Sequence, residues 1–238
     1  MDKQSNVAEK LSPKLAIDVR GVYKTFQQGN NAIEALKDIH LQARTGELLM
    51  IVGPSGCGKT TLLSVIAGTL RFDRGEIEVF NTALHSLSEQ KTTQFRKQHV
   101  GFIFQQYHLI RTLNCLENVS IPLLLNGINR SEAEERAAVL LEKIGLKGRE
   151  KENPLRLSGG QQQRIAIARA LVHEPQLVIC DEPTAALDAE TGARIMELMI
   201  EIARMPDRCV ILVTHDNRIF RYADRVAEMN DGKVLTIN

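Results

Sequence analysis

The chain has 238 residues, with 30 basic and 29 acidic side chains and a formal net charge of +1 at pH 7. This near-neutral balance gives no general electrostatic attraction to nucleic acid, so we expect no nucleic-acid partner. No apolar run reaches the roughly 18 residues that cross a bilayer, and the first residues lack the apolar core of a signal peptide, so we expect a soluble, cytoplasmic chain.

The amino-terminal part is predicted to be rich in β-structure. Residues 15–22 and 33–43 carry alternating and β-branched apolar positions on either side of a Gly29-Asn30-Asn31 turn. Glu76–Phe80 is predicted as a further short strand, and residues 1–14 as an amino-terminal tail.

A glycine-rich loop stands where a strand passes into a helix. The run Gly53-Pro-Ser-Gly-Cys-Gly-Lys59-Thr60 follows the apolar residues 48–52 and precedes the apolar residues 62–67. Glycines let backbone N–H groups converge on phosphate oxygens, while Lys59 supplies a point charge and Thr60 offers a hydroxyl to Mg²⁺. A plain turn is the alternative, but the order of strand, loop, Lys-Thr and helix predicts a nucleoside triphosphate site.

The four cysteines do not form a zinc or disulfide framework. Cys57, Cys115, Cys180 and Cys209 contain no Cys-x-x-Cys pair, which is typical of reduced thiols that pack as small buried residues. Cys57 lies inside the glycine-rich loop, so alkylation there is expected to block the phosphate site by bulk.

The pattern becomes helical between residues 114 and 146. Ser131–Arg136 resembles a capped helix start, and Val139, Leu140, Leu141 and Ile144 are predicted to form an apolar stripe. Four further elements are then predicted: a helix from Gln161 to about Val172, a buried strand Leu177–Cys180, a helix over 190–204 and a buried strand Cys209–Val213. This alternation predicts a parallel sheet.

Two carboxylates follow the first of those buried strands. Asp181 and Glu182 are placed at a carboxyl edge of the sheet that also carries the glycine-rich loop. We expect Asp181 to hold the metal ion and Glu182 to polarise the attacking water. Without the glycine-rich loop, the same pair would be read as solvated loop acids.

A second helix start also has the features of an anion site. Ser158, Gly159, Gly160 and Gln161 precede a helix, and such termini bind phosphate through backbone N–H groups. An ordinary capped helix start is the alternative for this segment taken alone. One nucleotide can hardly use both sites of one compact domain, so we expect the second site to face a nucleotide held by another copy of the chain.

With these motifs in order, essentially the whole chain resembles the ATPase subunit of ATP-binding cassette (ABC) transporters. In family terms, Gly53–Thr60 is the Walker A loop, Leu157–Gln161 the signature, Val178–Glu182 the Walker B strand, and Ala186–Asp188 the D-loop. Gln105 then matches the Q-loop glutamine and His215 the switch histidine. Phe26 falls where the family places an adenine-stacking aromatic, although Tyr is commoner there; Tyr23 is the neighbouring candidate, and packing in the core is the alternative for either.

The resemblance assigns residues to three roles. It implies binding of ATP and Mg²⁺. It also implies one domain spanning 15–238, with an α/β fold that has a P-loop NTPase core and a mostly parallel sheet. This domain includes an N-terminal antiparallel β subdomain and an inserted α-helical subdomain at about 106–160. The catalytic residues are Lys59, Glu182 and His215, and the metal residues are Thr60, Gln105 and Asp181. The nucleotide residues are Phe26, Gly53, Pro54, Ser55, Gly56, Cys57, Gly58, Lys59, Thr60, Thr61, Ser158, Gly159, Gly160, Gln161 and Asp188.

Finer motifs indicate a subgroup. Leu116–Val119 with Pro122–Leu125, and the run Gln161–Ala170, resemble the lipoprotein-releasing and macrolide-exporter group, although Cys180–Asp188 departs from the Pro-Thr-Gly-x-Leu-Asp usual there. The resemblance implies a nucleotide-sandwich homodimer on the inner face of the cell membrane, a separate integral membrane permease docked near Gln106–Leu113, and a periplasmic adaptor.

Two alternatives remain at this point. The same ATPase cycle can drive a periplasmic enzyme through a membrane partner without transport. A soluble cassette ATPase acting on DNA or ribosomes is the other, and the compact single cassette and near-neutral charge argue against it.

Overall fold

The computed structural model describes residues 14–29 and 31–238. The predicted tail therefore lies outside the described residues except for Lys14, as does Asn30 of the predicted turn. Within the described part, no helix combines the length and apolar character needed to cross a bilayer.

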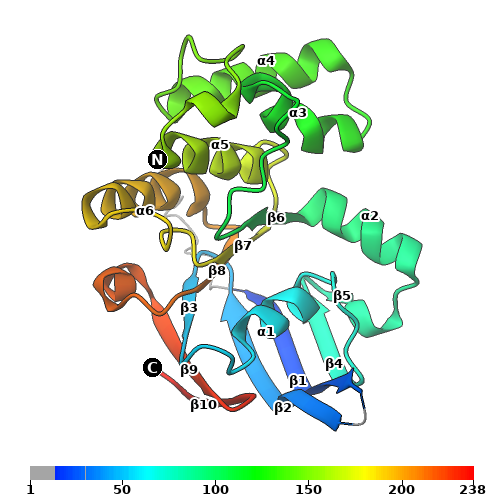
Figure 1. Ribbon diagram of the computed structural model, residues 1–238. Helices are drawn as coiled ribbons and strands as arrows, with labels where there is room; N and C mark the ends of the chain where they lie inside the picture. The colour runs from blue at the N-terminus through cyan, green and yellow to red at the C-terminus, as the bar shows by residue number, and fades with distance from the viewer. Residues whose placement is uncertain (1–13, 30) are drawn as a thin grey trace, which may run out of the picture.

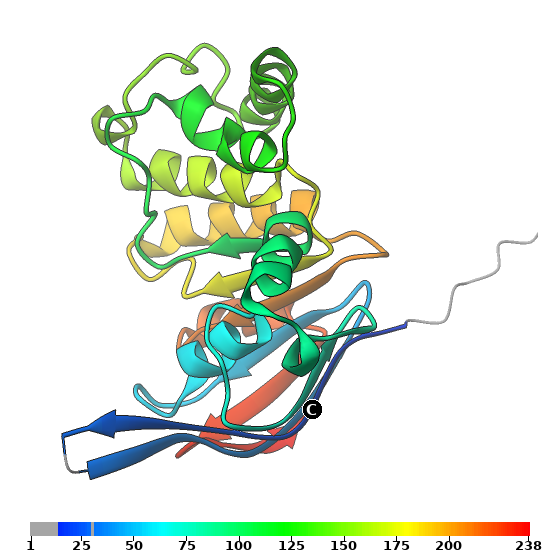
Figure 2. The ribbon, with the colours of Figure 1, turned by 90° about the vertical axis from the view of Figure 1, so that its right-hand side faces the viewer.

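The amino-terminal half contributes a four-stranded antiparallel sheet. Its strands are β1 (Leu15–Gln28), β2 (Asn31–Arg44), β4 (Arg74–Val79) and β5 (Thr82–Ala83), in the order β2-β1-β4-β5. The predicted β-rich region is confirmed, and Figure 2 shows the long β1–β2 hairpin projecting from the body of the protein. Phe80, predicted as a strand residue, instead forms the turn before β5 with Asn81, because both have positive φ.

A six-stranded sheet forms the centre of the molecule. It comprises β3 (Leu48–Val52), β6 (Val100–Ile103), β7 (Leu177–Asp181), β8 (Cys209–Val213), β9 (Arg225–Asn230) and β10 (Lys233–Ile237), in the order β10-β9-β3-β8-β7-β6. Only the β9–β10 pair is antiparallel. Every residue of β3 and β8 is buried, as expected for apolar strands covered on both faces. The predicted mostly parallel sheet is confirmed.

Helices cover both faces of this sheet, and further helices lie beyond one end of it (Figure 1). They are α1 (Lys59–Ile66), α2 (Glu89–His99), α3 (Cys115–Leu125), α4 (Arg130–Lys143), α5 (Gly159–Leu171) and α6 (Ala189–Ala203). Three short 3₁₀ helices are η1 (Leu84–Ser86), η2 (Pro154–Arg156) and η3 (Asn217–Tyr222).

Alternate residues of the central strands pack into two separate cores. Ile179 and Ile211 belong to the core that contains α1 and the antiparallel sheet. Val178 and Leu212 belong to the core that contains α5 and α6. Because neighbouring strand residues point to opposite faces, α1 and α5 lie on opposite faces of the central sheet.

A third core lies among α3, α4 and α5. Within it, the predicted helix start at Ser131 is wrong by two residues, since Asn129 caps α4 by accepting a hydrogen bond from the backbone N–H of Glu132. The predicted apolar stripe is also only partly correct. Leu141 and Ile144 are buried and Leu140 is partly buried, whereas Val139 is 53% exposed and lines an open groove with Leu171 and Val172.

Candidate active site

The glycine-rich loop follows β3 and is packed closely against two neighbouring strands. At Gly53, which has a φ of 152°, an added Cβ would lie 2.0 Å from the backbone oxygen of Met229 in β9. At Gly58, which has a φ of 102°, it would lie 2.4 Å from the backbone oxygen of Ala35 in β2. Side chains are therefore excluded at both positions, and α1 begins immediately afterwards at Lys59.

The Lys59 side chain folds back beneath this loop. Its Nζ donates hydrogen bonds to the backbone oxygens of Gly53 at 2.9 Å and Pro54 at 2.8 Å, and the residue is 7% exposed. No ion pair to Lys59 forms within the part of the chain that the structure describes. A buried ammonium whose partners are neutral groups is complementary to an anionic group placed over the loop.

Thr60 and Asp181 bring hydroxyl and carboxylate oxygens together at the end of β7. The Thr60 hydroxyl donates to Asp181, with oxygen distances of 3.1 and 3.4 Å to the two carboxylate atoms. Burial, and next the negative charge of Glu182, raise the pKa of Asp181, while the Thr60 hydrogen bond and Lys59 oppose that shift. A cation close to Asp181 would stabilise its charged form.

The donor set at this position suits Mg²⁺. Over residues 14–29 and 31–238, no group of three or more His, Cys, Asp or Glu side chains forms a protein cage for a metal. Mg²⁺ is commonly bound by one or two carboxylates together with hydroxyl groups, water and substrate phosphates, and Thr60 and Asp181 fit that pattern.

Glu182 and His215 meet beside the Thr60–Asp181 pair. Asp181 pairs in register with Val213 of β8, so both strands end at the same edge of the sheet. Glu182 has a φ of 48°, and its backbone N–H donates to the Val213 oxygen at 2.9 Å. Its Oε1 lies 2.8 Å from Nδ1 of His215, whose side chain is exposed. The structure thus brings these two predicted residues into direct contact.

Gln105 lies in the loop after β6, the strand beside β7. Ile103 pairs with Cys180, so Gln105 is placed at the same sheet edge as Asp181. Its side chain is exposed and forms no hydrogen bond among the described residues.

The signature segment forms a capped helix start. Ser158 caps α5: its Oγ accepts from the Gln161 N–H at 3.4 Å, and Gln161 Oε1 accepts from the Ser158 N–H at 3.0 Å. A Cβ at Gly159 would lie 2.8 Å from the Tyr107 hydroxyl, and one at Gly160 would lie 2.6 Å from Thr191 Cγ2. A side chain at either position would have to displace these side-chain ends, and the helix begins two residues before the predicted Gln161.

The structure does not bring the two anion-binding helix starts together in one chain. The core around α1 and the core around α5 occupy opposite faces of the central sheet. The helix that follows the loop and the helix that Ser158 caps are therefore held on different faces of the sheet.

The remaining predicted residues lie at the periphery. Asp188 caps α6 by accepting from the Glu190 and Thr191 N–H groups, and these hydrogen bonds lower its pKa. Phe26 lies on β1, is 40% exposed and stands 5.6 Å from the Lys24 ammonium.

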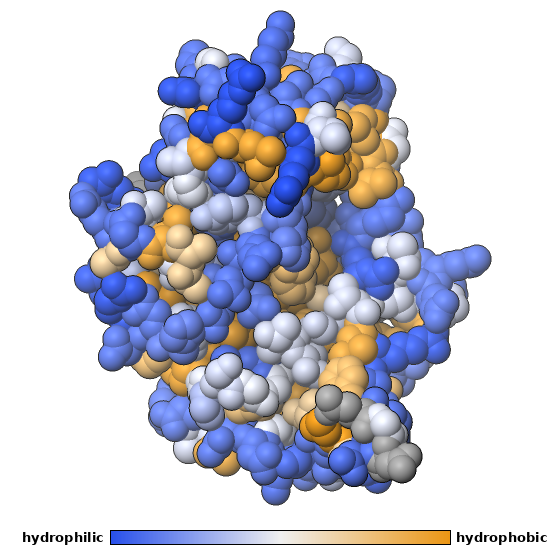
Figure 3. All heavy atoms as spheres, viewed as in Figure 1, coloured by the Kyte–Doolittle hydropathy of each residue, from blue (hydrophilic) through white to orange (hydrophobic). Residues whose placement is uncertain are grey.

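A groove of 340 Å³ opens between α2, β6, α3 and α5. Its apolar lining includes Phe104 and Leu125, and its charged lining is cationic: Arg96, Lys97 and Arg169. Figure 3 shows apolar side chains gathered over α3 on this face, above a hollow that separates the upper helices from α2. Of the predicted permease contact Gln106–Leu113, His108 lines the groove. The other lining residues were not predicted, because they come from four separate elements that only the fold brings together.

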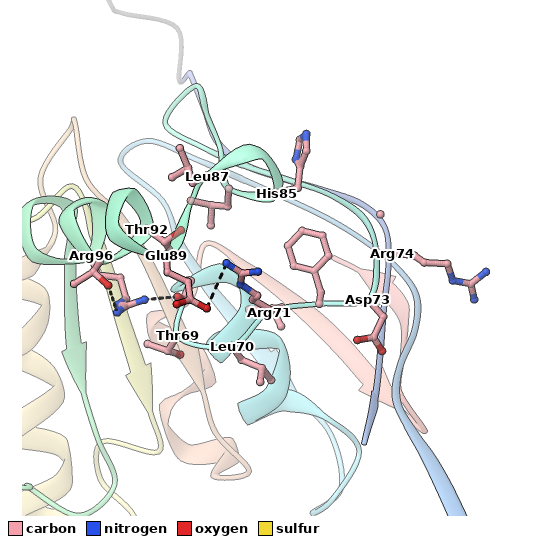
Figure 4. Close-up of a pocket in the computed structure, with 16 residues that line it drawn as sticks. Thr69, Leu70, Arg71, Asp73, Arg74, His85, Leu87, Glu89, Thr92 and Arg96 are labelled. Carbon is pink, nitrogen blue, oxygen red and sulfur yellow. Dashed lines mark hydrogen bonds and ion pairs between the residues drawn. The ribbon is translucent and has the colours of Figure 1, made fainter. Parts of the chain in front are cut away.

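A second hollow, of 540 Å³, lies on the other side of α2 and contains no predicted site residue (Figure 4). Its charged groups have partners within the protein: Arg71 pairs with Glu89, Asp73 with Lys24, and Arg96 donates to the Gly68 oxygen. The Lys24 hydrogen bond lowers the pKa of Asp73. We therefore place the chemistry at the loop before α1 and not in this larger hollow.

The strand, glycine-rich loop and helix, with Lys59 beneath the loop and carboxylates at the adjacent strand end, define a P-loop nucleotide-binding protein. The chain belongs to the ABC transporter family, since the family described as "ABC transporter" matches residues 36–185.

Individual relatives refine this assignment. The "Lipoprotein-releasing system ATP-binding protein LolD" of Legionella pneumophila (strain Lens) is 40% identical over 90% of this chain and 94% of that protein. The "Macrolide export ATP-binding/permease protein MacB" of Wolinella succinogenes is 41% identical over 93% of this chain, which spans 34% of that longer protein. These matches confirm the predicted resemblance to the lipoprotein-releasing and macrolide-exporter group.

A solved structure agrees with the fold. The dimeric "post-hydrolysis state of the ATP-binding cassette MJ0796 bound to ADP and Pi" superposes with a TM-score of 0.86 and 37% identity, covering 93% of this chain and 97% of that one. The predicted α/β cassette fold is confirmed. The chain is an ATP-binding and ATP-hydrolysing subunit of an ABC transporter.

Proposed function

We propose that two copies of this chain close head to tail over two Mg·ATP molecules and drive a separate membrane permease of the exporter or envelope type. The observation that carries the proposal is the placement of the Lys59 loop and the Ser158 helix start on opposite faces of one sheet. Each nucleotide then needs the second helix start from the partner copy. The dimeric ADP-bound relative supports this arrangement.

The phosphates are held by the loop and the helix start that follows it. Backbone N–H groups of the loop, which Pro54 lacks, are proposed to bind the phosphate oxygens, and the Lys59 ammonium exchanges its carbonyl partners for a phosphate. Phe26 offers an exposed ring face to adenine. The partner copy completes each site with its Ser158, Gly159, Gly160 and Gln161, and Asp188 lies at the contact between the copies.

Thr60, Asp181 and Gln105 are the residues that would hold Mg²⁺. When bound, the ion would supply positive charge that offsets the negative charge of the triphosphate. The Thr60 hydroxyl and the Asp181 carboxylate are already adjacent, so little rearrangement is needed. Gln105 supplies a carbonyl oxygen from the neighbouring strand end.

Glu182 is proposed to orient the attacking water and accept its proton. The His215 ring holds the carboxylate from one side through the 2.8 Å contact and extends toward solvent, where it reaches the γ-phosphate in the closed dimer. Both groups are fixed by the ends of adjacent strands, so their geometry is set before the nucleotide binds.

The permease is proposed to dock in the groove beside the loop after β6. This groove combines apolar walls with Arg96, Lys97 and Arg169, and it opens between α2, β6, α3 and α5, where Phe104 and His108 of the loop also line it. One relative carries its ATP-binding and permease parts in a single protein by name, which supports a membrane partner for this chain. We therefore place the chain on the inner face of the cell membrane, with a periplasmic adaptor as a further component.

The test uses the Glu182→Gln variant, which should bind ATP without hydrolysing it and remain a closed dimer. We would purify this variant with ATP from detergent-solubilised native membranes and identify its companions by mass spectrometry. A permease, with or without an adaptor, is the expected result. Recovery with ribosomes or DNA and no membrane protein would overturn the proposal, and recovery with a membrane protein joined to a cell-wall enzyme would replace export by mechanical signalling.

Mixed dimers test the shared sites separately. Ser158→Arg places a long side chain against the partner's γ-phosphate, so one such subunit should disable one of the two sites. Full activity at both sites in a mixed dimer would contradict sharing of the signature between copies.

A further inference from the structure

The loop after β6 is attached to α5 through one arginine. Arg169, in the last turn of α5, donates from Nη2 to the Tyr107 oxygen at 2.8 Å and from Nη1 to the His108 oxygen at 2.6 Å. Burial lowers the pKa of Arg169, and no carboxylate pairs with it within residues 14–29 and 31–238. The desolvated guanidinium thus donates hydrogen bonds to two carbonyl groups of the loop. Its planar arrangement of N–H donors suits this pair of acceptors.

The same loop also contacts the other end of α5. The Tyr107 hydroxyl covers Gly159, where a Cβ would lie 2.8 Å from it. Gly159 and Arg169 are separated by ~15 Å along the helix. Tyr107 and the extended Arg169 side chain together therefore link the two ends of α5, with the Tyr107 hydroxyl at the signature end and its backbone oxygen on the Arg169 guanidinium.

The loop itself is folded tightly. His108 has a φ of 47°, and its ring lies 4.7 Å from that of Phe104, which stacks at 4.2 Å on Phe102. Phe104, His108 and Arg169 all line the groove between α2 and α5. The loop that follows Gln105 consequently touches the groove and the signature helix at once.

We propose that Arg169 and Tyr107 are positioning residues that lock the loop after β6 onto α5, so that groove and signature move as one unit toward the partner's nucleotide. This inference rests on the proposed nucleotide-sandwich dimer. Loss of the lock should leave ATP binding to the chain's own loop intact, because that loop lies on the opposite face of the sheet. It should weaken closure of the dimer, because the signature is no longer held at a fixed angle.

The chain provides a matched control on the same helix. Arg164 of α5 is also partly buried and donates to a backbone oxygen, that of Ile144 at 3.1 Å, but it ties α5 to the end of α4 and not to the loop. Arg164→Met therefore removes an equivalent bond without touching the proposed lock.

The experiment measures ATP-dependent dimerisation by size-exclusion chromatography with light scattering, with all variants in the Glu182→Gln background. We expect Arg169→Met to raise the ATP concentration for half-maximal dimer about tenfold or more, since hydrogen bonds to charged groups are lost. Arg164→Met should stay within about twofold of the parent, and Arg169→Lys, which keeps the charge but not the fork, should fall between them. Tyr107→Ala should follow Arg169→Met.

A second readout separates positioning from general destabilisation. In the Ser158→Arg background, which cannot close, the Arg169→Met substitution should leave the affinity of the monomer for a fluorescent ATP analogue unchanged. Equal dimerisation by the Arg169→Met and Arg164→Met variants would overturn the inference. If Arg169→Met fails to fold, the dimerisation of Arg169→Lys and of Tyr107→Ala is compared with that of Arg164→Met instead. Failure of the Glu182→Gln parent to dimerise would instead overturn the proposed dimer.

Discussion

His215 Nδ1 lies 2.8 Å from Glu182 Oε1, although the two residues are 33 positions apart in the chain. The contact arises because β7 and β8 are parallel neighbours that end at the same edge of the sheet. On the other side of the site, Asp181 accepts from Thr60. Adjacent carboxylates on one strand end are thus given different partners, a hydroxyl for Asp181 and an imidazole for Glu182, which fits the separate roles proposed for them.

His215→Ala should reduce ATP turnover by about 10²-fold or more while ATP binding persists, because Glu182 loses the group that orients it. Phosphate release under saturating ATP measures turnover, and equilibrium binding measures affinity. Arg218→Ala, which removes a nearby exposed partner of Asp216, serves as the control and should change turnover by less than about twofold. Adding His215→Ala to Glu182→Gln should have little further effect, because the two residues act as a unit. Normal turnover by His215→Ala would remove the histidine from the catalytic set.

Asp181→Asn should stabilise the nucleotide-free protein at pH 7 and weaken its response to Mg·ATP. Burial raises the pKa of Asp181 in the folded state above its usual value of 3.8. Between pH 3.8 and that raised pKa, the folded chain binds more protons than the unfolded chain. The free energy of unfolding therefore falls as pH rises through this interval. An amide avoids this desolvation and can still accept from Thr60. We expect Tm to rise by about 1–4 °C at pH 7, with a smaller difference toward pH 4.

Scanning calorimetry at two pH values, with and without Mg·ATP, checks this prediction. Wild-type protein should gain stability from Mg·ATP, whereas the variant should gain less. A variant that melts below wild type at pH 7 without nucleotide would show that the Asp181 charge stabilises the empty site.

The sequence predicted strand positions best where an apolar run is followed directly by polar residues of the site. Cys209–Val213 is β8 with the predicted bounds, and Asp181 directly ends β7. The helix cap in the middle segment could not be located from sequence, because Asn129 with Glu132 and Ser131 with Glu134 have the same spacing. In the structure Asn129 is the cap, and Ile128 before it packs against the core among α3, α4 and α5.

Long-range contacts within the site were beyond prediction. The bond between Arg169 and Tyr107 joins residues 62 positions apart, and neither residue carries a local signature. Likewise, the cations of the groove come from α2 and α5, and only the fold places them on one wall. Placement of α1 and α5 on opposite faces depends on the alternation of β7 residues, and it gives the proposed dimer its physical basis.

Alkylation by N-ethylmaleimide should inactivate the protein through Cys57 alone. Cys115, Cys180 and Cys209 are fully buried, and burial raises the pKa of each thiol, to about 11 for Cys115. Cys57 is 6% exposed and lies in the phosphate loop with Sγ 3.9 Å from Lys59 Nζ, so an added group there displaces phosphate. Peptide mapping and residual ATPase activity measure the reaction. ATP should protect, Cys57→Ala should retain activity, and inactivation of Cys57→Ala at the wild-type rate would refute the assignment.

Asn118→Ala should destabilise the protein by about 2–4 kcal/mol, because it leaves several buried loop groups without partners. Asn118 is fully buried in α3: its Oδ1 accepts from the Ile110 N–H, and its Nδ2 lies within hydrogen-bond distance of the Ile110, Leu113 and Asn114 oxygens. These bonds fix the segment that runs from the groove into α3.

Thermal melting measures this loss, which should lower Tm by about 5–10 °C. Ser120→Ala is the matched control, since Ser120 is equally buried in α3 but donates only to the Leu116 oxygen, which the helix backbone already satisfies. Its Tm should fall by no more than about 3 °C. Equal shifts for the two variants would show that loss of any buried polar contact in α3 explains the effect. A larger shift for Asn118→Ala, accompanied by faster proteolysis within residues 109–114, would place the defect in the loop, because that segment depends on the amide for its backbone hydrogen bonds.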